Sequence, residues 1–182
     1  MKKLEVEVDG ELKDFTIPEK WSEVSVWQTM QLYSLESEEH NSIEKIVKIV
    51  NILTGVDEEM LYQMTQDQFM ELTNTINFTN DEIKGELKDC IKIGTEEYYI
   101  KKDFDKLTLG EIISIDTIMQ NNDNNLSKSM TELLCVFLRK KNTKGKLESF
   151  KSDFMEREEV FRDIPITDIN NLFLFFLDGR PS

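Results

Sequence analysis

Two stretches of the chain alternate apolar and polar residues on both sides of a glycine-containing turn. Residues 4–17 do so around Asp9-Gly10, and residues 90–100 do so around Gly94-Thr95. An alternation of period two that reverses at such a turn is typical of a β-hairpin. The pattern therefore predicts one hairpin near the N-terminus and another in the middle of the chain. The two hairpins would either pair into one four-stranded sheet or pack separately on their own helices, because a lone hairpin is only marginally stable.

Elsewhere the apolar residues recur every three or four positions, which is the spacing of amphipathic helices. Each hairpin is followed by one helix, then by a second helix over residues 43–53 or 130–137, then by a short acidic segment beginning at residue 58 or 158 and a last helix. Gly55 stands where glycine commonly ends a helix. The chain is thus predicted to be α+β and helix-dominant, with two β-hairpins and about eight helices in a pseudo-duplicated arrangement.

The same order of elements occurs twice, and the two copies match in register. The counterparts lie 83 residues apart at Trp21 and Phe104, and 100 residues apart in the last helices. The sequence therefore predicts an internal duplication, with a first repeat over residues 1–80 and a second over 88–182. The second repeat carries an insertion at 139–153. Repeats of this size are small for separate cores, so we expect one compact, pseudo-symmetric unit.

Helix starts are marked by capping boxes, in which a hydroxyl and a carboxyl or amide side chain bond to free amides of the first turn. The boxes are Ser25-x-x-Gln28 and Thr108-x-x-Glu111 before the first helix of each repeat, and Thr65-x-x-Gln68 before the last helix of the first repeat. Pro165 stands at the matching place in the second repeat. Proline suits the first turn of a helix, so we expect the last helix of the second repeat to begin there.

The chain is acidic, and this narrows the classes of protein to which it can belong. Its 182 residues carry 22 Lys and Arg against 36 Asp and Glu, a formal net charge of −14. Because nucleic acids and anionic membranes attract clustered positive charge, direct binding to either is not expected. No apolar run approaches the ~20 residues that span a bilayer, and we expect no secretory signal. Cys90 and Cys135 are therefore expected to stay reduced, as small core residues of a cytoplasmic chain.

Residue types that carry catalysis or bind metals are scarce and poorly spaced. His40, the only histidine, lies in a polar segment to which no Ser, Cys or Asp pattern points. Residues 121–125 resemble the start of a calcium-binding loop, but Leu126 stands where that loop needs glycine for its sharp turn. The paired glutamates at 58 and 158 suit the first turn of a helix rather than an acid–base pair. We therefore expect no enzymatic activity, no catalytic residue, no bound metal and no cofactor.

Two segments are candidates for a surface that binds other proteins. One is the basic cluster at the start of the insertion, which is either a solvated loop or a docking site for an acidic partner, including another copy of this chain. The other is the aromatic run at residues 172–177, which is either core or part of a partner surface. The candidate residues are Arg139, Lys140, Lys141, Lys144, Lys146, Phe173, Phe175 and Phe176.

The layout of these motifs resembles that of a known group of proteins. The pattern W-x-x-[VL]-[ST]-[VL]-x-[QE] occupies residues 21–28, L-T-G-V occupies 53–56 and E-E-x-L occupies 58–61, with related versions at 104–111 and 161–165. The layout is similar to that of small acidic proteins encoded in the structural gene blocks of tailed bacteriophages, crAss-like phages included. The resemblance implies a tail- or hub-assembly chaperone or a virion-associated cargo protein, without catalytic residues.

From the charge and the resemblance together, we expect a non-enzymatic virion-associated or virion-assembly protein that acts through protein–protein contacts. Its partners would be portal, tail or capsid components, with self-association as a further option. Its location would be the virion, the host bacterial cytoplasm or both. The alternative is an acidic host-directed inhibitor or regulatory binding protein that mimics the charge of nucleic acid. The lysines interspersed among the acidic residues weaken that alternative, because a mimic should align its carboxylates on one face.

Overall fold

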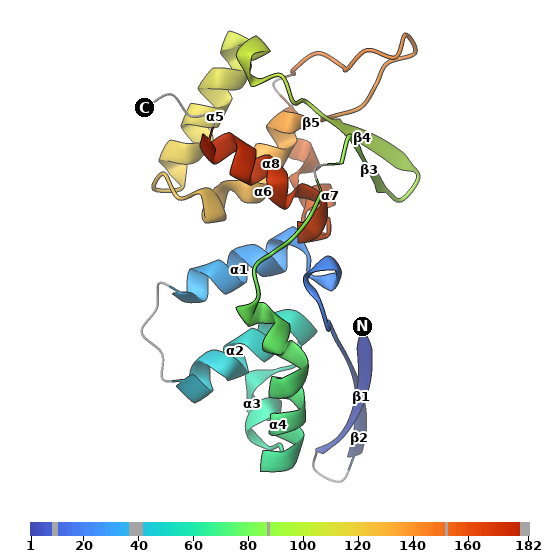
Figure 1. The fold of residues 1–182 in the computed structure, drawn as a ribbon, viewed down its shortest axis with the longest axis vertical. Helices are drawn as coiled ribbons and strands as arrows, with labels where there is room; N and C mark the ends of the chain where they lie inside the picture. The colour runs from blue at the N-terminus through green and yellow to red at the C-terminus, as the bar shows by residue number, and fades with distance from the viewer. Residues whose placement is uncertain (9–10, 37–41, 87, 152, 179–182) are drawn as a thin grey trace.

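Two lobes are stacked along the long axis of the molecule, with helix α1 at the junction between them (Figure 1). This computed structural model describes residues 1–8, 11–36, 42–86, 88–151 and 153–178. The turn predicted at Asp9-Gly10 and the histidine at position 40 lie outside the described residues. Within the described part of the chain, eight α-helices accompany two small antiparallel sheets, which confirms the predicted helix-dominant α+β fold.

The N-terminal lobe begins with a hairpin and continues as helices. Its elements are β1 (Lys2–Val8), β2 (Glu11–Ile17), the 3₁₀ helix η1 (Trp21–Glu23), α1 (Val26–Glu36), α2 (Ser42–Thr54), α3 (Glu58–Tyr62), α4 (Gln66–Thr75) and η2 (Ile76–Asn80). β1 and β2 pair antiparallel, with Lys2 opposite Ile17. Gly55 follows α2 with a φ of 72°. This is the left-handed conformation that glycine adopts without a Cβ clash, so the predicted helix end is confirmed.

The C-terminal lobe repeats the order of hairpin, 3₁₀ helix and α-helices, and adds a short strand and a further 3₁₀ helix between its second and third α-helices. Its elements are β3 (Cys90–Ile93), β4 (Glu96–Ile100), η3 (Phe104–Lys106), α5 (Leu109–Asn121), α6 (Leu126–Phe137), β5 (Leu138–Arg139), η4 (Phe154–Arg157), α7 (Glu158–Phe161) and α8 (Ile166–Asp178). The sheet order is β3-β4-β5, so the two hairpins lie in separate sheets. The sequence did not predict β5, because two residues carry no strand pattern and pair only through β4.

All three capping boxes form as predicted. Each hydroxyl accepts a hydrogen bond from the amide three residues on, at 3.1 Å for Gln28, 3.3 Å for Gln68 and 3.3 Å for Glu111. The side chain at that third position accepts a hydrogen bond from the amide of the capping residue in return. α1 and α5 thus begin in the same way, 83 residues apart, whereas α4 and α8 begin 100 residues apart.

The start of α1 joins the two lobes through backbone hydrogen bonds. The Val26 amide donates to the Ile164 carbonyl at 2.8 Å, and the Ile166 amide donates to the Val24 carbonyl at 2.9 Å. Ser25 therefore lies opposite Pro165 in an antiparallel bridge. Buried apolar residues from both lobes form one continuous cluster, so the lobes share a core across this junction.

The connection between the lobes runs along α8. The Asn170 side-chain amide donates to the Ile83 carbonyl at 3.1 Å, and Lys88 Nζ lies 2.6 Å from Asp168 Oδ1. Between these two contacts the backbone comes so close to α8 that a Cβ on Gly85 would collide with the Thr167 carbonyl oxygen. The connection, which the structure describes over residues 81–86 and 88–89, is thus held against the second lobe rather than being a free linker, and we call it the strap.

Candidate functional site

The basic cluster predicted from the sequence lies in an insertion that projects from the second lobe (Figure 1). Lys141 and Leu147 face each other in an isolated antiparallel bridge, and Gly145 turns the chain with a φ of 73°. The Asn142 side-chain oxygen accepts hydrogen bonds from backbone amides two and four residues on, at 3.0 and 3.1 Å. The insertion is therefore a defined turn, built by local hydrogen bonds of the type that asparagine favours.

Arg139 does not lie on the exposed surface to which the sequence assigned it. It is only 2% exposed at the end of β5, and its Nη2 atom lies 2.6 Å from Glu111 Oε1. The remaining guanidinium donors reach the carbonyls of Val136, at 3.1 and 2.7 Å, and Glu148, at 3.3 Å. The Phe150 ring covers the guanidinium, 4.9 Å from Cζ. Burial is possible because these donors find acceptors, and it ties the start of the insertion both to α5, through Glu111, and to residues 148–150 farther along the insertion.

Glu111 joins this arginine to the start of α5. Its Oε2 atom lies 2.7 Å from Lys101 Nζ and accepts hydrogen bonds from the Thr108 amide at 2.6 Å and the Thr108 hydroxyl at 2.8 Å. Burial raises the pKa of the Glu111 carboxyl, but the hydrogen bonds from Lys101 and Thr108 and the charge of Arg139 outweigh it, and the pKa falls to about 2. The carboxylate is ionised at neutral pH and holds α5, β4 and β5 together.

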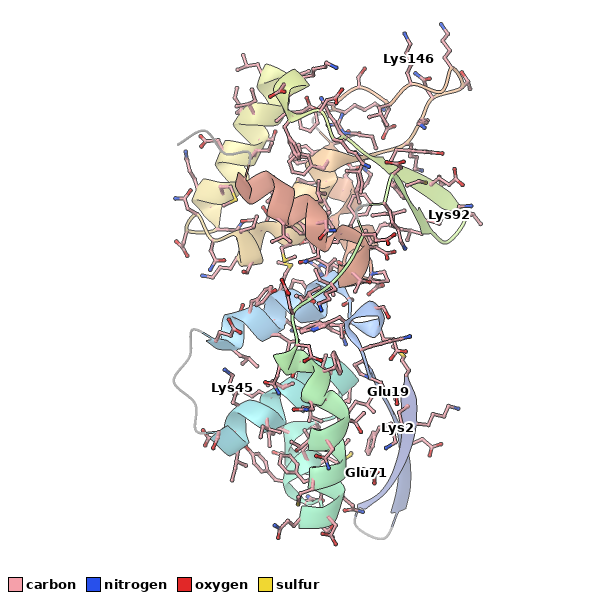
Figure 2. The ribbon with its side chains drawn as sticks, in the orientation of Figure 1. Lys2, Glu19, Lys45, Glu71, Lys92 and Lys146 are labelled. Atoms are coloured by element: carbon pink, nitrogen blue, oxygen red, sulfur yellow. The ribbon has the colours of Figure 1, made fainter. Side chains whose placement is uncertain are left out.

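Of the remaining lysines of the cluster, Lys140 is half-buried, and Lys141, Lys144 and Lys146 are exposed. Lys140 Nζ pairs with Glu96 at 2.8 Å, and Lys141 Nζ lies 3.6 Å from the centroid of the Tyr99 ring. Lys144 and Lys146 are exposed at the turn, and Figure 2 shows Lys146 at its outer edge. The arrangement presents positive charge in one place and can attract carboxylates by Coulombic forces.

The aromatic run is not an exposed surface where the structure describes it. Phe173 is 4% exposed and belongs to the core, which corrects its assignment to a partner surface. The physical reason is that α8 packs beside η1 and under the strap, so apolar residues on its inner side are covered. The side chains of Phe175 and Phe176 lie outside the described residues.

The segment that resembles a calcium loop is a turn between α5 and α6. Asp123 and Asn124 both adopt a φ of 57°, and the Asn125 side-chain oxygen caps α6 by accepting hydrogen bonds from the amides of Ser127 and Lys128. Over the part of the chain that the structure describes, no group of three or more His, Cys, Asp or Glu side chains is placed to hold a metal ion.

A groove of about 380 Å³ lies beside the junction of the lobes, and sequence reasoning did not find it. Its walls come from η1, α1, α2, η2, the strap and α8, and include Trp21, Lys45, Asp81 and Asn170. The Trp21 indole nitrogen donates to the Asp81 carbonyl at 2.9 Å, which closes one side of the groove. These residues are far apart in the sequence, so no local motif could have indicated that they meet.

A second feature missed from the sequence is an apolar face of α5. Leu109, Ile112 and Ile113 are 73%, 50% and 55% exposed. The three side chains form one face, because residues three and four apart lie on the same side of a helix. Ile115 and Ile118, on the other side, are buried. The sequence did contain a signal for this exposed face. Residues 109–121 carry apolar residues on both sides of the helix, whereas a surface helix needs only one apolar stripe.

Comparison with known proteins gives no relative from which a role could be transferred. No described helix is long and apolar enough to cross a membrane. No family model, curated protein or solved structure matches the chain.

Proposed function

We propose that the chain is a non-enzymatic protein-binding subunit of a tailed-phage particle or of its assembly machinery, and that it docks on an acidic protein surface through the lysines of its insertion. The observation that supports this most is the exposure of Lys144 and Lys146 on a turn whose base is fixed by the buried Arg139–Glu111 pair. The phage context comes from the motif layout described above. In a chain of net charge −14, this turn provides local positive charge.

A turn fixed in this way suits binding for an energetic reason. Because its backbone is already held by Asn142 and by Arg139, less conformational entropy is lost when a partner orders it. Charged groups at the rim of an interface mainly raise the rate of association and set specificity. Contacts of this kind weaken with ionic strength, since the screening length is about 8 Å at 0.15 M salt.

The first test is quantitative mass spectrometry of purified phage particles, in which copies of this chain are counted against the major capsid protein. Many copies in the mature particle would support a structural or cargo role. Absence from particles together with abundance in lysates of infected cells would support an assembly role. Absence from both would contradict the phage assignment.

The second test addresses the lysines directly. A carbodiimide joins lysine amines to carboxylates that touch them, so treatment of particles or lysates should link the insertion to its partner. The double substitution Lys144→Glu and Lys146→Glu should remove this link and abolish salt-sensitive binding to the linked partner. Lys3→Glu with Lys20→Glu makes the same change of charge at exposed sites of the first lobe and serves as the matched control. If both double variants lose the cross-link and the salt-sensitive binding equally, only the net charge matters, and the assignment of the site to the insertion is contradicted.

A further inference from the structure

Helix α1 is covered on two opposite faces. Gln28, on one face, donates from its side-chain amide to the carbonyls of Ile52 and Leu53, at 3.2 Å each, so this face lies on α2. Val26 and Met30 lie on the opposite face, because a helix turns 100° per residue, and both are buried. α1 also contacts α6, and Figure 1 shows it between the two lobes. The second face of α1 is therefore covered by the second lobe.

The segment that receives α1 in the second lobe is the turn between α7 and α8. Its backbone exchanges hydrogen bonds with the start of α1 through Ile164 and Ile166, and the Arg162 carbonyl accepts from the Trp27 amide at 3.1 Å. The Arg162 guanidinium also lies over the Trp27 ring, 4.6 Å from its centroid. Together with α6, which is buried from Leu133 to Phe137, this turn forms a seat for the second face of α1.

Helix α5 is built like α1 but is covered on one face only. The Leu107 amide bonds back to the Phe104 carbonyl just as the Val24 amide bonds back to the Trp21 carbonyl. Glu111 occupies the place of Gln28 and faces the core, as Gln28 does. The counterparts of Val26, Thr29 and Met30, which are all buried, are the exposed residues Leu109, Ile112 and Ile113. The face that binds the second lobe in α1 is thus left uncovered in α5.

The first lobe carries the counterpart of the seat, and it too is uncovered. In the turn between α3 and α4 the Met64 amide donates to the Leu61 carbonyl, as the Ile164 amide does to the Phe161 carbonyl. Tyr62, at the end of α3 beside this turn, is 59% exposed, and Met70, in the middle of α4, is 54% exposed. α2, at the place of α6, buries only one face, through Val47, Val50 and Leu53.

We propose that the exposed face of α5 in one copy docks on α2 and the α3–α4 turn of a second copy, repeating between molecules the contact that joins the two lobes within one. The occupant is a second copy because this chain already contains the surface that fits such a face. The contact is head-to-tail, so a docked pair of copies keeps one free face, on one copy, and one free seat, on the other, and the assembly grows as an open row or closes as a ring. The proposal is independent of the lysine-bearing insertion.

The charge of the chain makes the salt dependence of this contact distinctive. Each copy carries a net charge of −14, so copies repel one another at long range. Salt screens that repulsion and leaves apolar burial unaffected or strengthened. Self-association through α5 should therefore increase with salt, whereas binding through the lysines of the insertion should decrease. The two proposals can fail separately.

Sedimentation velocity of the full chain over a range of concentrations tests the proposal, with far-UV circular dichroism as a check of folding. The wild-type protein should form species larger than a monomer. The fraction of these species should increase as the salt concentration is raised from about 0.05 M to about 0.5 M, because the screening length shortens over this range. Ile112→Asp should weaken association by at least about tenfold, as expected for a central apolar contact. Val160→Asp alters an apolar residue that is also exposed but lies off both surfaces, and should leave association unchanged.

A mixing experiment identifies the head-to-tail mode. Tyr62→Asp should block the seat, so neither it nor Ile112→Asp should form rows alone. Mixed together, the two variants should form a dimer and nothing larger, because one supplies an intact face and the other an intact seat. A wild-type chain that stays monomeric at all concentrations would overturn the proposal. So would normal association of Tyr62→Asp, which would show that α5 pairs with α5 about a two-fold axis.

Discussion

Arg139 and Glu111 form an ion pair inside the protein, with Nη2 2.6 Å from Oε1 and both side chains almost completely buried. Removing one partner leaves the other charged in a medium that solvates it poorly. Arg139→Met should therefore lower the free energy of unfolding by about 3–5 kcal/mol, measured by urea denaturation. As a control, Asp103→Asn breaks the exposed pair with Lys106 and should produce no measurable change. An Arg139→Met variant as stable as the wild type would show that the guanidinium is not buried.

The same pair predicts that the free energy of unfolding depends on pH. The folded pKa of Glu111 is about 2, below its ordinary value of 4.5, so the carboxylate contributes stability above pH 4.5 that is lost as the pH falls toward 2. At neutral pH this contribution is on the order of 3 kcal/mol. The stability difference between wild type and Glu111→Gln should therefore be constant from pH 7 to 5 and shrink below it. A difference that does not change down to pH 2.5 would contradict the low pKa.

The strap between the lobes gives a steric prediction. Because a Cβ on Gly85 would collide with the Thr167 carbonyl oxygen, Gly85→Ala must displace the strap from α8. The expected loss of stability is about 1–3 kcal/mol by thermal or urea unfolding. Gly110→Ala is the matched control, since its Cβ would meet only the Phe150 ring at 3.4 Å and alanine favours a helix. If both variants lose equal stability, the strap does not lie against α8 in solution.

The two cysteines should differ in reactivity. Burial raises the pKa of the Cys135 thiol to about 12, with the nearby Glu158 charge adding to the effect, whereas Cys90 is partly exposed at the start of β3. Thiolates are the reactive form, so a thiol reagent should modify Cys90 in the folded chain and reach Cys135 only after urea is added. Mass spectrometry of the labelled peptides measures this, and rapid labelling of Cys135 in the native protein would contradict its burial.

What the sequence predicted well is what short segments decide alone. The capping boxes at Ser25, Thr65 and Thr108, and the hairpin turn at Gly94, depend on side chains within a few residues, so their geometry follows from local chemistry. Local agreement of this kind also fixed the helix-dominant fold class.

What the sequence did not predict depends on partners brought from elsewhere. Arg139 looked like the first residue of an exposed basic run, and only the meeting of α5, β5 and Phe150 around it explains its burial. Val26 and Leu109 stand in equivalent local patterns, yet Val26 is buried and Leu109 is exposed. The reason is that only α1 has a second lobe to cover its second face. Periodicity identifies an apolar face but not what covers it.

The bridge between Ser25 and Pro165 has a consequence for how the chain folds as it is synthesised. Synthesis proceeds from the N-terminus, so α1 is made long before the turn at residues 162–166 that seats it. Contacts of such long sequence separation form late and slow folding. During that interval Val26 and Met30 are uncovered, and the turn of another nascent chain competes with the chain's own. Crowded synthesis on one messenger therefore favours exchange of second lobes between neighbouring chains, whereas dilute refolding favours closure within one chain.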